Sequence, residues 1–249
     1  MTEILYGRHP IREALRSGRP LNKILIARGL GGPVFREIRG LAAARGIRLQ
    51  LVDRRALDRI ASGGVHQGYL AFAAVKEYVT VDDILVGAEE PPLLVVLAHI
   101  TDPRNLGAIL RTAAAAGVDG VIIPSRRAAG LSGEVAKAAA GAVEQVPVAR
   151  VTNIARTLRC LKERGFWIVG AEAGAPAVLW EVRLTGAIAV VIGGETAGLG
   201  RTIQKECDYK VRIPMSGKIA SLNASVAAAV VLYEVFRQRY RADAGNNNR

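Results

Sequence analysis

The apolar segment LLVVLAHI, residues 93–100, is the feature that most restricts what this chain can fold into. Its first six residues are all apolar, and a strand without polar alternation is typical of a parallel sheet that is covered on both faces. Further short strands are predicted at FWIVGAEA, AIAVVIG and YKVRIP, and helical patterns are found at 102–117, 132–145, 152–165 and 221–240. Strand and helix alternate, which predicts an α/β domain with a mostly parallel sheet.

A smaller module of alternating strands and helices precedes this domain. Residues 4–18 are predicted as a short entry and a helix that ends at Gly18, and strands follow at LNKILIA, IRLQLVD and GGVHQGYLAFAAV. Helices are predicted between these strands, over 34–46 and 54–62. We therefore predict four parts: an N-terminal α/β module over 1–76, a linker over 77–92, a second domain over 93–242 and a disordered tail over 243–249.

The basic charge of the chain is concentrated in its first third. Lys and Arg total 34 and Asp and Glu total 22, so the formal net charge at pH 7 is +12. Residues 1–77 hold 14 basic and 6 acidic side chains, a net of +8. This asymmetry favours docking on a polyanion, most often nucleic acid, over a merely arginine-biased composition. Aromatic residues make up 5% of the chain, which favours phosphate contacts on structured RNA over stacking on single strands.

Two features of the first module are candidates for RNA contact. Arg8, Arg12, Arg16 and Arg19 recur every three or four residues, so we expect one basic face on the first helix, the alternative being a solvated face. The pair His66-Gln67 before Gly68 is either a structural turn or a second RNA contact.

Several functional classes are disfavoured by the sequence. No apolar run reaches the ~18 residues of a membrane helix, and the segment MTEILYGRHP has no secretory pattern. Cys160 and Cys207 lack CxxC spacing, and the histidines are scattered, which favours free thiols over a disulfide or zinc site. GxGxxG, P-loop and GxSxG motifs are missing from the sequence. We therefore expect a cytoplasmic protein without a membrane segment or metal ion.

Two loops of small residues in the second domain predict a ligand site. They lie in VVIGGETAGLG (190–200) and IPMSGKIASLNASV (213–226), each between an apolar run and a helical pattern. Open parallel sheets bind ligands at the carboxyl ends of their strands, where small residues let a ligand approach the backbone. The loops contribute one carboxylate, one amide and two hydroxyls, from Glu195, Asn223, Ser221 and Ser225. This composition suits a small ligand next to a polar reacting group.

Three segments carry a resemblance to a known family. In order and spacing, NLGAILRTAAAAGVDGVI (105–122), VVIGGETAGLG (190–200) and IPMSGKIASLNASVAAAVVLYE (213–234) resemble the three motifs of the SpoU (TrmH-like) RNA 2′-O-ribose methyltransferases of the SPOUT clan. SGGVHQGYLA (62–71) is similar to the segment that ends the ribosomal-protein-like RNA-binding domain of the RlmB-like branch. That branch methylates a guanosine ribose in large-subunit (23S) ribosomal RNA. The resemblance covers nearly the whole chain.

The resemblance implies a fold, a cofactor and an assembly. The second domain is expected to be a SPOUT α/β domain with a deep trefoil knot, and the first an RNA substrate-binding domain. S-adenosyl-L-methionine is the expected methyl donor, structured RNA the expected partner, and a homodimer the expected assembly, with the site near its interface. Cofactor contacts are implied around Gly193, Ile213 and Leu222. Catalytic roles are implied for Asn105, Arg111, Glu195, Ser221 and Asn223.

The implied roles have to be weighed against the chemistry of each side chain. In the family the arginine at the position of Arg111 is the proposed activator of the ribose 2′-OH. Because a guanidinium has a pKa above ~12, we expect Arg111 to position the substrate phosphate and stabilise the developing alkoxide, with the phosphate as proton acceptor. Glu195 is expected to orient catalytic groups by pairing with Arg111, the alternative being a solvated loop carboxylate. For Asn105, Ser221 and Asn223 the alternative is ordinary capping of a helix N-terminus.

The sequence therefore predicts an S-adenosylmethionine-dependent RNA 2′-O-ribose methyltransferase that acts on guanosine of large-subunit ribosomal RNA. One alternative is the same chemistry on a transfer-RNA guanosine or at an antibiotic-resistance site of ribosomal RNA. An alternative of another class is a non-catalytic RNA-binding factor in ribosome assembly. The complete set of Asn105, Arg111, Glu195, Ser221 and Asn223 disfavours this second alternative.

Overall fold

The chain folds into two compact units. The computed structural model describes residues 2–74, 77–194, 198–217, 219 and 221–246. One unit comprises Met1–Glu77 together with Gly130–Gln145, and the other comprises Tyr78–Ala129 together with Val146–Arg249. The segment 130–145, which the sequence assigns to the second domain, thus packs with the first unit. The domain boundaries predicted above stay predictions.

The first unit contains a four-stranded sheet, and the described N-terminal part of the chain adds the helices α1, α2 and α3 to it. The strand order is β1-β4-β2-β3; β4 is antiparallel to both its neighbours, and β2 and β3 are parallel. Buried Leu25, Leu57 and Leu70 lie in its core. The elements are β1 (Thr2–Tyr6), α1 (Arg8–Arg16), β2 (Leu21–Ala27), α2 (Pro33–Ala44), β3 (Arg48–Val52), α3 (Arg54–Ala61) and β4 (Tyr69–Ala74). The predicted entry before α1 is thus an edge strand, ordered by pairing with β4.

The predicted helix over 132–145 is interrupted in the structure. It forms α6 (Gly133–Ala139) and a 3₁₀ turn (Ala142–Glu144), because Ala140 and Gly141 adopt left-handed backbone angles, φ 51° and 97°. A Cβ at Gly141 would lie 2.4 Å from Cγ of Glu13 on α1, so the break lets the chain approach that helix closely. Glu144 then accepts a 2.6 Å hydrogen bond from the nearly buried Arg19. These contacts explain why 130–145 packs with the first unit.

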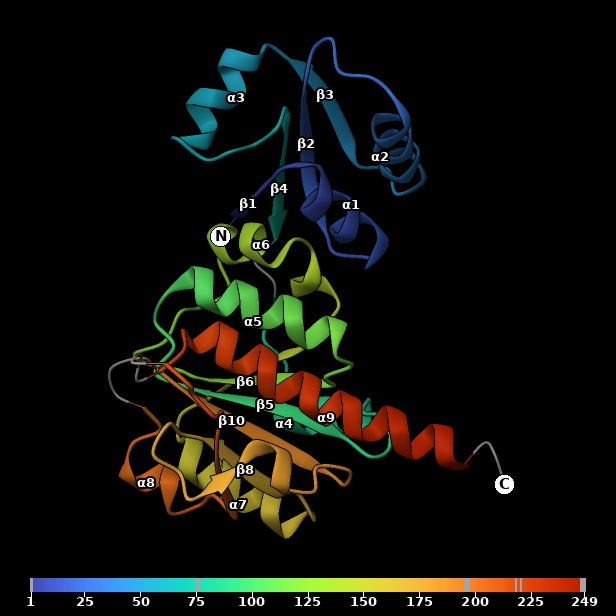
Figure 1. Ribbon diagram of the computed structural model, residues 1–249. Helices are drawn as coiled ribbons and strands as arrows, with labels where there is room; N and C mark the ends of the chain where they lie inside the picture. Colours follow the sequence, from blue (N-terminus) through green and yellow to red (C-terminus); the bar gives the residue numbers. More distant parts are fainter. Residues whose placement is uncertain (1, 75–76, 195–197, 218, 220, 247–249) are drawn as a thin grey trace. The chain divides into compact units, whose positions relative to one another are not determined.

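The second unit confirms the predicted mostly parallel sheet (Figure 1). Its seven strands have the order β7-β6-β5-β10-β8-β11-β9, and every pairing described between them is parallel. The strands are β5 (Leu93–Ala98), β6 (Gly120–Pro124), β7 (Val148–Val151), β8 (Trp167–Ala171), β9 (Ala177–Val178), β10 (Ile188–Gly193) and β11 (Tyr209–Arg212).

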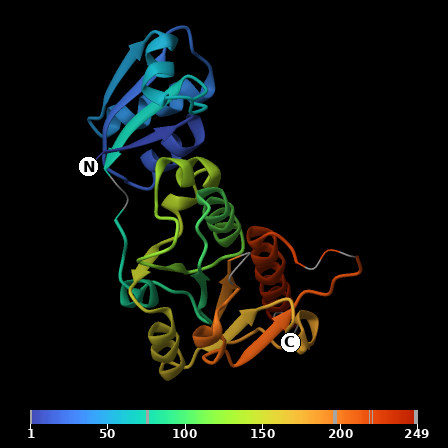
Figure 2. The same ribbon diagram turned by 90° about the vertical axis from the view of Figure 1, so that its left-hand side faces the viewer.

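Helices cover both faces of this sheet, which is why its central strands are apolar throughout. Leu94 and Val96 of β5 face a core cluster that includes residues of α4, α7 and α8. Because side chains alternate along a strand, Leu93, Val95 and Leu97 face the side on which α5 and α9 lie next to one another (Figures 1 and 2). All six residues of β5 are buried. The helices are α4 (Val81–Val86), α5 (Pro103–Ala115), α7 (Ile154–Glu163), α8 (Arg201–Gln204) and α9 (Ala224–Asn246).

Two observations concern membrane and metal binding. Among the described residues, none of the helices combines the length and apolar character that a membrane span requires. In the same part of the chain, histidine, cysteine and carboxylate side chains do not gather in groups of three or more that could hold a metal ion.

Candidate active site

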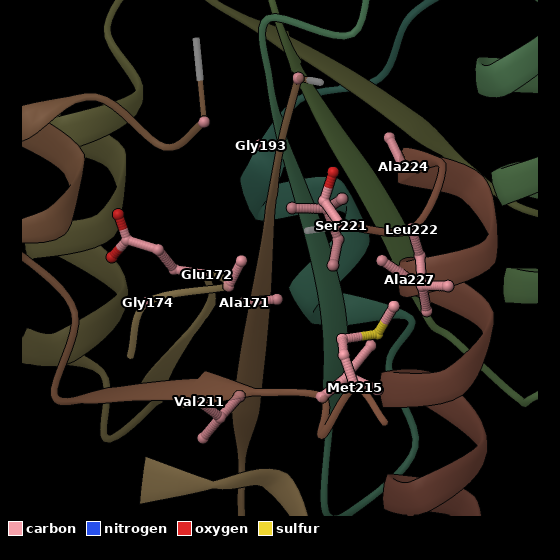
Figure 3. A pocket seen from close by; sticks show the side chains of 15 residues that line it. Ala171, Glu172, Gly174, Gly193, Val211, Met215, Ser221, Leu222, Ala224 and Ala227 are labelled. Carbon is pink, nitrogen blue, oxygen red and sulfur yellow. The ribbon is translucent and has the colours of Figure 1, made fainter. Parts of the chain in front are cut away.

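A pocket of about 410 Å³ opens at the carboxyl ends of β8, β10 and β11, beside the start of α9 (Figure 3). This is the edge at which open parallel sheets bind ligands, and the volume is in the usual range for small-molecule sites. The walls are formed mainly by small and apolar residues. They are Ala171, Glu172, Ala173, Gly174, Ile192, Gly193, Gly194, Gly198, Val211, Ile213, Met215, Ser221, Leu222, Ala224 and Ala227.

Two glycines at the end of β10 allow the chain to fold back tightly beside the pocket. A Cβ at Gly193 would lie 2.3 Å from the carbonyl carbon of Gly198 and 2.5 Å from its oxygen. A Cβ at Gly194 would lie 2.4 Å from the carbonyl oxygen of His99. Since real Cβ atoms essentially never approach other heavy atoms below 3.0 Å, only glycine fits at either position without a backbone shift.

Four residues predicted from the sequence lie together at this pocket. Gly193, Ile213 and Leu222, the candidates for cofactor contact, all line it, and so does Ser221, a candidate for catalysis. They come from the end of β10 and from the loop between β11 and α9, so the fold joins the two small-residue loops into one site.

Glu172 is the charged side chain among the lining residues, and none of the three sequence motifs contains it. It follows β8 and lies across the pocket from Met215, Leu222 and α9 (Figure 3). Its Oε1 accepts a 2.5 Å hydrogen bond from Nε2 of Gln204, which fixes the carboxylate at the wall. The sequence signal for Glu172 is the segment FWIVGAEAG, in which a carboxylate stands among small residues after an apolar strand. The two loops that predict the ligand site have the same composition.

Asn105 and Asn223 form a hydrogen-bonded pair beside the pocket. Nδ2 of Asn223 donates to Oδ1 of Asn105 over 3.0 Å, and Asn223 lies between two lining residues, Leu222 and Ala224. Oδ1 of Asn223 accepts hydrogen bonds from the backbone amide of Ser225 at 2.9 Å and from its hydroxyl at 2.6 Å. Asn223 therefore shapes the start of α9 and holds Asn105 at the same time.

The capping alternative for Asn105 is wrong. The residue that caps α5 is Asp102, whose side chain accepts from the backbone amide of Arg104 at 2.8 Å. Asn105 lies inside the first turn, and its amide oxygen is bound by Asn223 instead of a helix amide. Its side chain is thus held beside the site by a contact with Asn223, the residue that precedes α9.

Of the two remaining catalytic candidates, Arg111 lies within the described residues and Glu195 does not. Arg111 is exposed on α5 and does not belong to the described pocket lining. It lies six residues after Asn105, so the two side chains are about 120° apart around the helix. Glu195 lies outside the described residues, so its suggested pairing with Arg111 stays a prediction.

A parallel α/β sheet with a pocket between glycine-rich strand-end loops defines the class of fold, and comparison with known proteins defines the family. A model of the SpoU rRNA Methylase family matches residues 92–233, and one described as RNA 2′-O ribose methyltransferase substrate binding matches residues 4–79. The chain therefore belongs to the SpoU methylase family and is an S-adenosylmethionine-dependent RNA methyltransferase with a SPOUT fold.

Individual proteins resemble the chain over nearly its full length. YacO of Bacillus subtilis, named for the TrmH family of tRNA/rRNA methyltransferases, is 44% identical over 240 residues, which cover 95% of this chain and 96% of YacO. The AdoMet complex of the SpoU methyltransferase AviRb from Streptomyces viridochromogenes superposes with a TM-score of 0.82 at 27% identity, covering 96% of this chain and 90% of AviRb. The AdoMet-bound rRNA methyltransferase from Sinorhizobium meliloti has a TM-score of 0.81 at 25% identity, covering 95% and 87% of the two chains.

The residues at the pocket fit S-adenosylmethionine, which supplies the methyl group when bound. Apolar walls from Ile192, Val211 and Leu222 suit an adenine ring, and the glycines expose backbone amides and carbonyls to its polar edge. The Glu172 carboxylate suits the ribose hydroxyls and the positive charge of such a ligand. Among the described lining residues, Glu172 supplies one negative charge and the others are neutral, which suits a positively charged ligand.

Proposed function

We propose that the protein methylates the ribose 2′-OH of a guanosine in large-subunit ribosomal RNA. The observation that carries this proposal is the Asn105–Asn223 pair beside the cofactor pocket, because it brings two polar groups from the first and third motifs to one place. Transfer to a hydroxyl requires the acceptor to be held in line with the methyl group rather than covalently activated. Two linked amides can hold a ribose and its neighbouring groups in that orientation.

The basic first unit supports ribosomal RNA as the target. Residues 1–77 have a net charge of +8, and residues 4–79 match the substrate-binding model of RNA 2′-O ribose methyltransferases. The rRNA methyltransferase from Sinorhizobium meliloti is similar to 95% of this chain, so the likeness includes the first unit as well as the site. A transfer-RNA guanosine or an antibiotic-resistance site of ribosomal RNA is the alternative target.

In this proposal Arg111 acts on the RNA rather than on the cofactor. Because its guanidinium remains charged, it binds the phosphate next to the target ribose and stabilises the alkoxide as the 2′-OH loses its proton. The phosphate accepts that proton. Arg111 is exposed and is not among the described lining residues of the pocket, which suits a group that meets the RNA.

The proposed assembly is a homodimer formed through α9. One face of this helix is buried against the sheet through Ala228, Val231 and Val235. Another face exposes Tyr233, Phe236 and Tyr240. The ring centroid of Phe236 lies 5.9 Å from that of Tyr233 and 6.0 Å from that of Tyr240. Exposed aromatic residues in a row are typical of an interface, and a second copy would cover them. A dimer would also allow Arg111 of one copy to reach the RNA held by the other. The knot and a cytoplasmic location stay predictions.

Methyl transfer with labelled S-adenosylmethionine tests the function. The protein is incubated with in vitro transcripts of 23S ribosomal RNA and of transfer RNA, and the label is mapped to a nucleotide and to the 2′ position. We expect label on a guanosine ribose of the ribosomal RNA. Label on transfer RNA alone would support the alternative target. Tight RNA binding without transfer to any RNA would support the non-catalytic assembly factor instead.

The variant Arg111→Ala tests the assigned role. We expect it to abolish transfer and to leave the dissociation constant for S-adenosylmethionine, measured by calorimetry, unchanged. A collapse of cofactor affinity in this variant would show that Arg111 belongs to the cofactor site.

A further inference from the structure

The arginines expected to form an RNA-binding face of the first helix are largely engaged within the protein. Arg16 Nη2 lies 2.5 Å from Glu37 Oε1, and Arg12 is within ion-pair distance of both Glu13 and Glu37. Arg19 follows the helix and is buried against Glu144. Arg19 therefore does not belong to the predicted face, because it is buried and lies outside the helix. For Arg12 and Arg16, whose charges are partly neutralised, RNA contact stays a prediction. Arg8 is exposed and, in the described part of the chain, has no ion-pair partner.

The topology of the four-stranded sheet brings Arg8 to an edge with other basic residues. Strands β1, β2 and β3 run in one direction and β4 runs in the opposite one. The carboxyl ends of the first three strands and the amino end of β4 therefore lie at one edge. Backbone hydrogen bonds close this edge, since the Gly7 amide donates to the Tyr69 carbonyl and the Arg28 amide donates to the Val52 carbonyl. Four exposed arginines lie within three residues of these strand ends, namely Arg8, Arg28, Arg54 and Arg55. Of these, Arg28 is within ion-pair distance of Asp53, at 4.0 Å.

A pocket of about 370 Å³ lies at the same edge. Leu30, Val34 and Tyr69 form apolar walls, and Arg8 and Gln67 add a positive charge and an amide. Gln67 lies close to the start of α1, because a Cβ at Gly7 would be 3.6 Å from its Oε1. Burial raises the pKa of Tyr69, and the positive charge of Arg8 partly opposes this shift, which agrees with their shared position in the pocket.

The turn that carries Gln67 is held rigidly by its neighbour. His66 is 4% exposed, its Nδ1 accepts a 3.0 Å hydrogen bond from the Gly68 amide, and its Nε2 lies 2.8 Å from Asp58 Oδ1. Since Nδ1 accepts, Nε2 carries the proton and donates to Asp58. Gln67 itself adopts φ 51°, a left-handed angle that is uncommon for a residue with a side chain. Strained residues held by their surroundings cluster at binding sites. His66 thus has the structural role and Gln67 is available to a ligand.

We propose that this pocket binds one unpaired nucleotide of the substrate RNA, other than the nucleotide that is methylated. An extruded base offers an apolar face to Leu30 and Val34 and a hydrogen-bonding edge to the amide of Gln67, which both donates and accepts. Arg8 binds the phosphate of that nucleotide, and Arg54 and Arg55 bind phosphates further along the strand. The pocket selects RNA by a base that is already unstacked. This inference rests on the proposed RNA methyltransferase function.

Matched variants separate base binding in the pocket from general attraction to RNA. Arg8→Ala and Gln67→Ala change the pocket, and Arg48→Ala removes the same charge from an exposed arginine at the start of β3, the opposite edge of the sheet. The affinity for a 23S ribosomal RNA transcript is measured by filter binding over a range of salt concentrations. Thermal unfolding and calorimetric titration with S-adenosylmethionine are measured on the same proteins to confirm that each variant is folded.

We expect Arg8→Ala and Gln67→Ala each to weaken RNA binding on the order of tenfold. Arg8→Ala also lowers the slope of log affinity against log salt by about one, whereas Gln67→Ala leaves the slope unchanged. Arg48→Ala changes neither quantity, and all three variants keep the cofactor affinity of the wild type. An equal loss in Arg48→Ala, or an unchanged affinity in Gln67→Ala, would overturn the proposal. Failure of the wild type to transfer methyl groups to RNA that it binds would instead overturn the proposed function.

Discussion

Replacing Gly193 with alanine tests whether the close approach of Gly193 to Gly198 shapes the cofactor pocket. The added Cβ would lie 2.3 Å from the carbonyl carbon of Gly198, 2.5 Å from its oxygen and 2.7 Å from the amide nitrogen of Leu199. Real Cβ atoms stay at least 3.0 Å from other heavy atoms, so the carbonyl carbon of Gly198 and the added Cβ must separate by at least about 0.7 Å. Forced rearrangement of packed atoms costs roughly 1–3 kcal/mol. Gly193 and Gly198 both line the pocket, so the movement distorts its wall.

Gly174→Ala is the matched control for this substitution. Gly174 lines the same pocket, but a Cβ built there has no heavy atom within 4 Å, and its backbone is not in the left-handed region. We expect calorimetry to show at least a roughly tenfold loss of S-adenosylmethionine affinity in Gly193→Ala, since about 1.4 kcal/mol corresponds to that factor. The unfolding temperature of Gly193→Ala should fall by about 2–4 °C for each kcal/mol of strain. Equal cofactor affinity in the two alanine variants would refute the close-approach argument.

Three further predictions concern the pocket and its surroundings. Glu172→Gln should weaken S-adenosylmethionine binding on the order of tenfold with little change in unfolding temperature, and an unchanged calorimetric affinity would remove Glu172 from the cofactor site. In a double-mutant cycle of Asn105→Ala and Asn223→Ala, unfolding free energies should show a coupling of roughly 0.5–1.5 kcal/mol, whereas strict additivity would contradict the hydrogen bond. Burial raises the pKa of Cys207 to about 11, so at pH 8 only roughly one thiol in a thousand is ionised. Its alkylation by iodoacetamide, followed by mass spectrometry, should be slow at pH 8 and accelerate about tenfold per pH unit up to that pKa, while exposed Cys160 reacts first.

Much of the fold could be predicted from local patterns. The apolar run at β5 predicted a strand buried on both faces, and the structure confirms it, because helices pack on each side. The helical spacing of apolar residues and the capping residues likewise located most of the described helices within a few residues. The edge strand β1 was missed because its five residues become a strand only by pairing with β4, which lies far along the chain.

The break in the helix predicted over 132–145 was also beyond local signals. An alanine-rich segment has high helix propensity, so nothing in its own residues required the left-handed angles at Ala140 and Gly141. Packing against Glu13 and Arg19 of the first unit accounts for them. Arg12, Arg16 and Arg19 illustrate the same limit, since their spacing predicted a basic face but not the carboxylates from other elements that pair with them.

For the site, the sequence by itself determined the chemistry of the groups and the small-residue loops that hold them. The motifs identified Gly193, Ile213, Ser221 and Leu222, and the structure brings all four to one pocket. Only the tertiary structure decided which groups meet across elements. Asn105 and Asn223 are 118 residues apart, and their hydrogen bond depends on how α5 and α9 lie together on the sheet. Glu172 lines the pocket for the same reason, because parallel pairing aligns the ends of β8, β10 and β11 at one edge of the sheet.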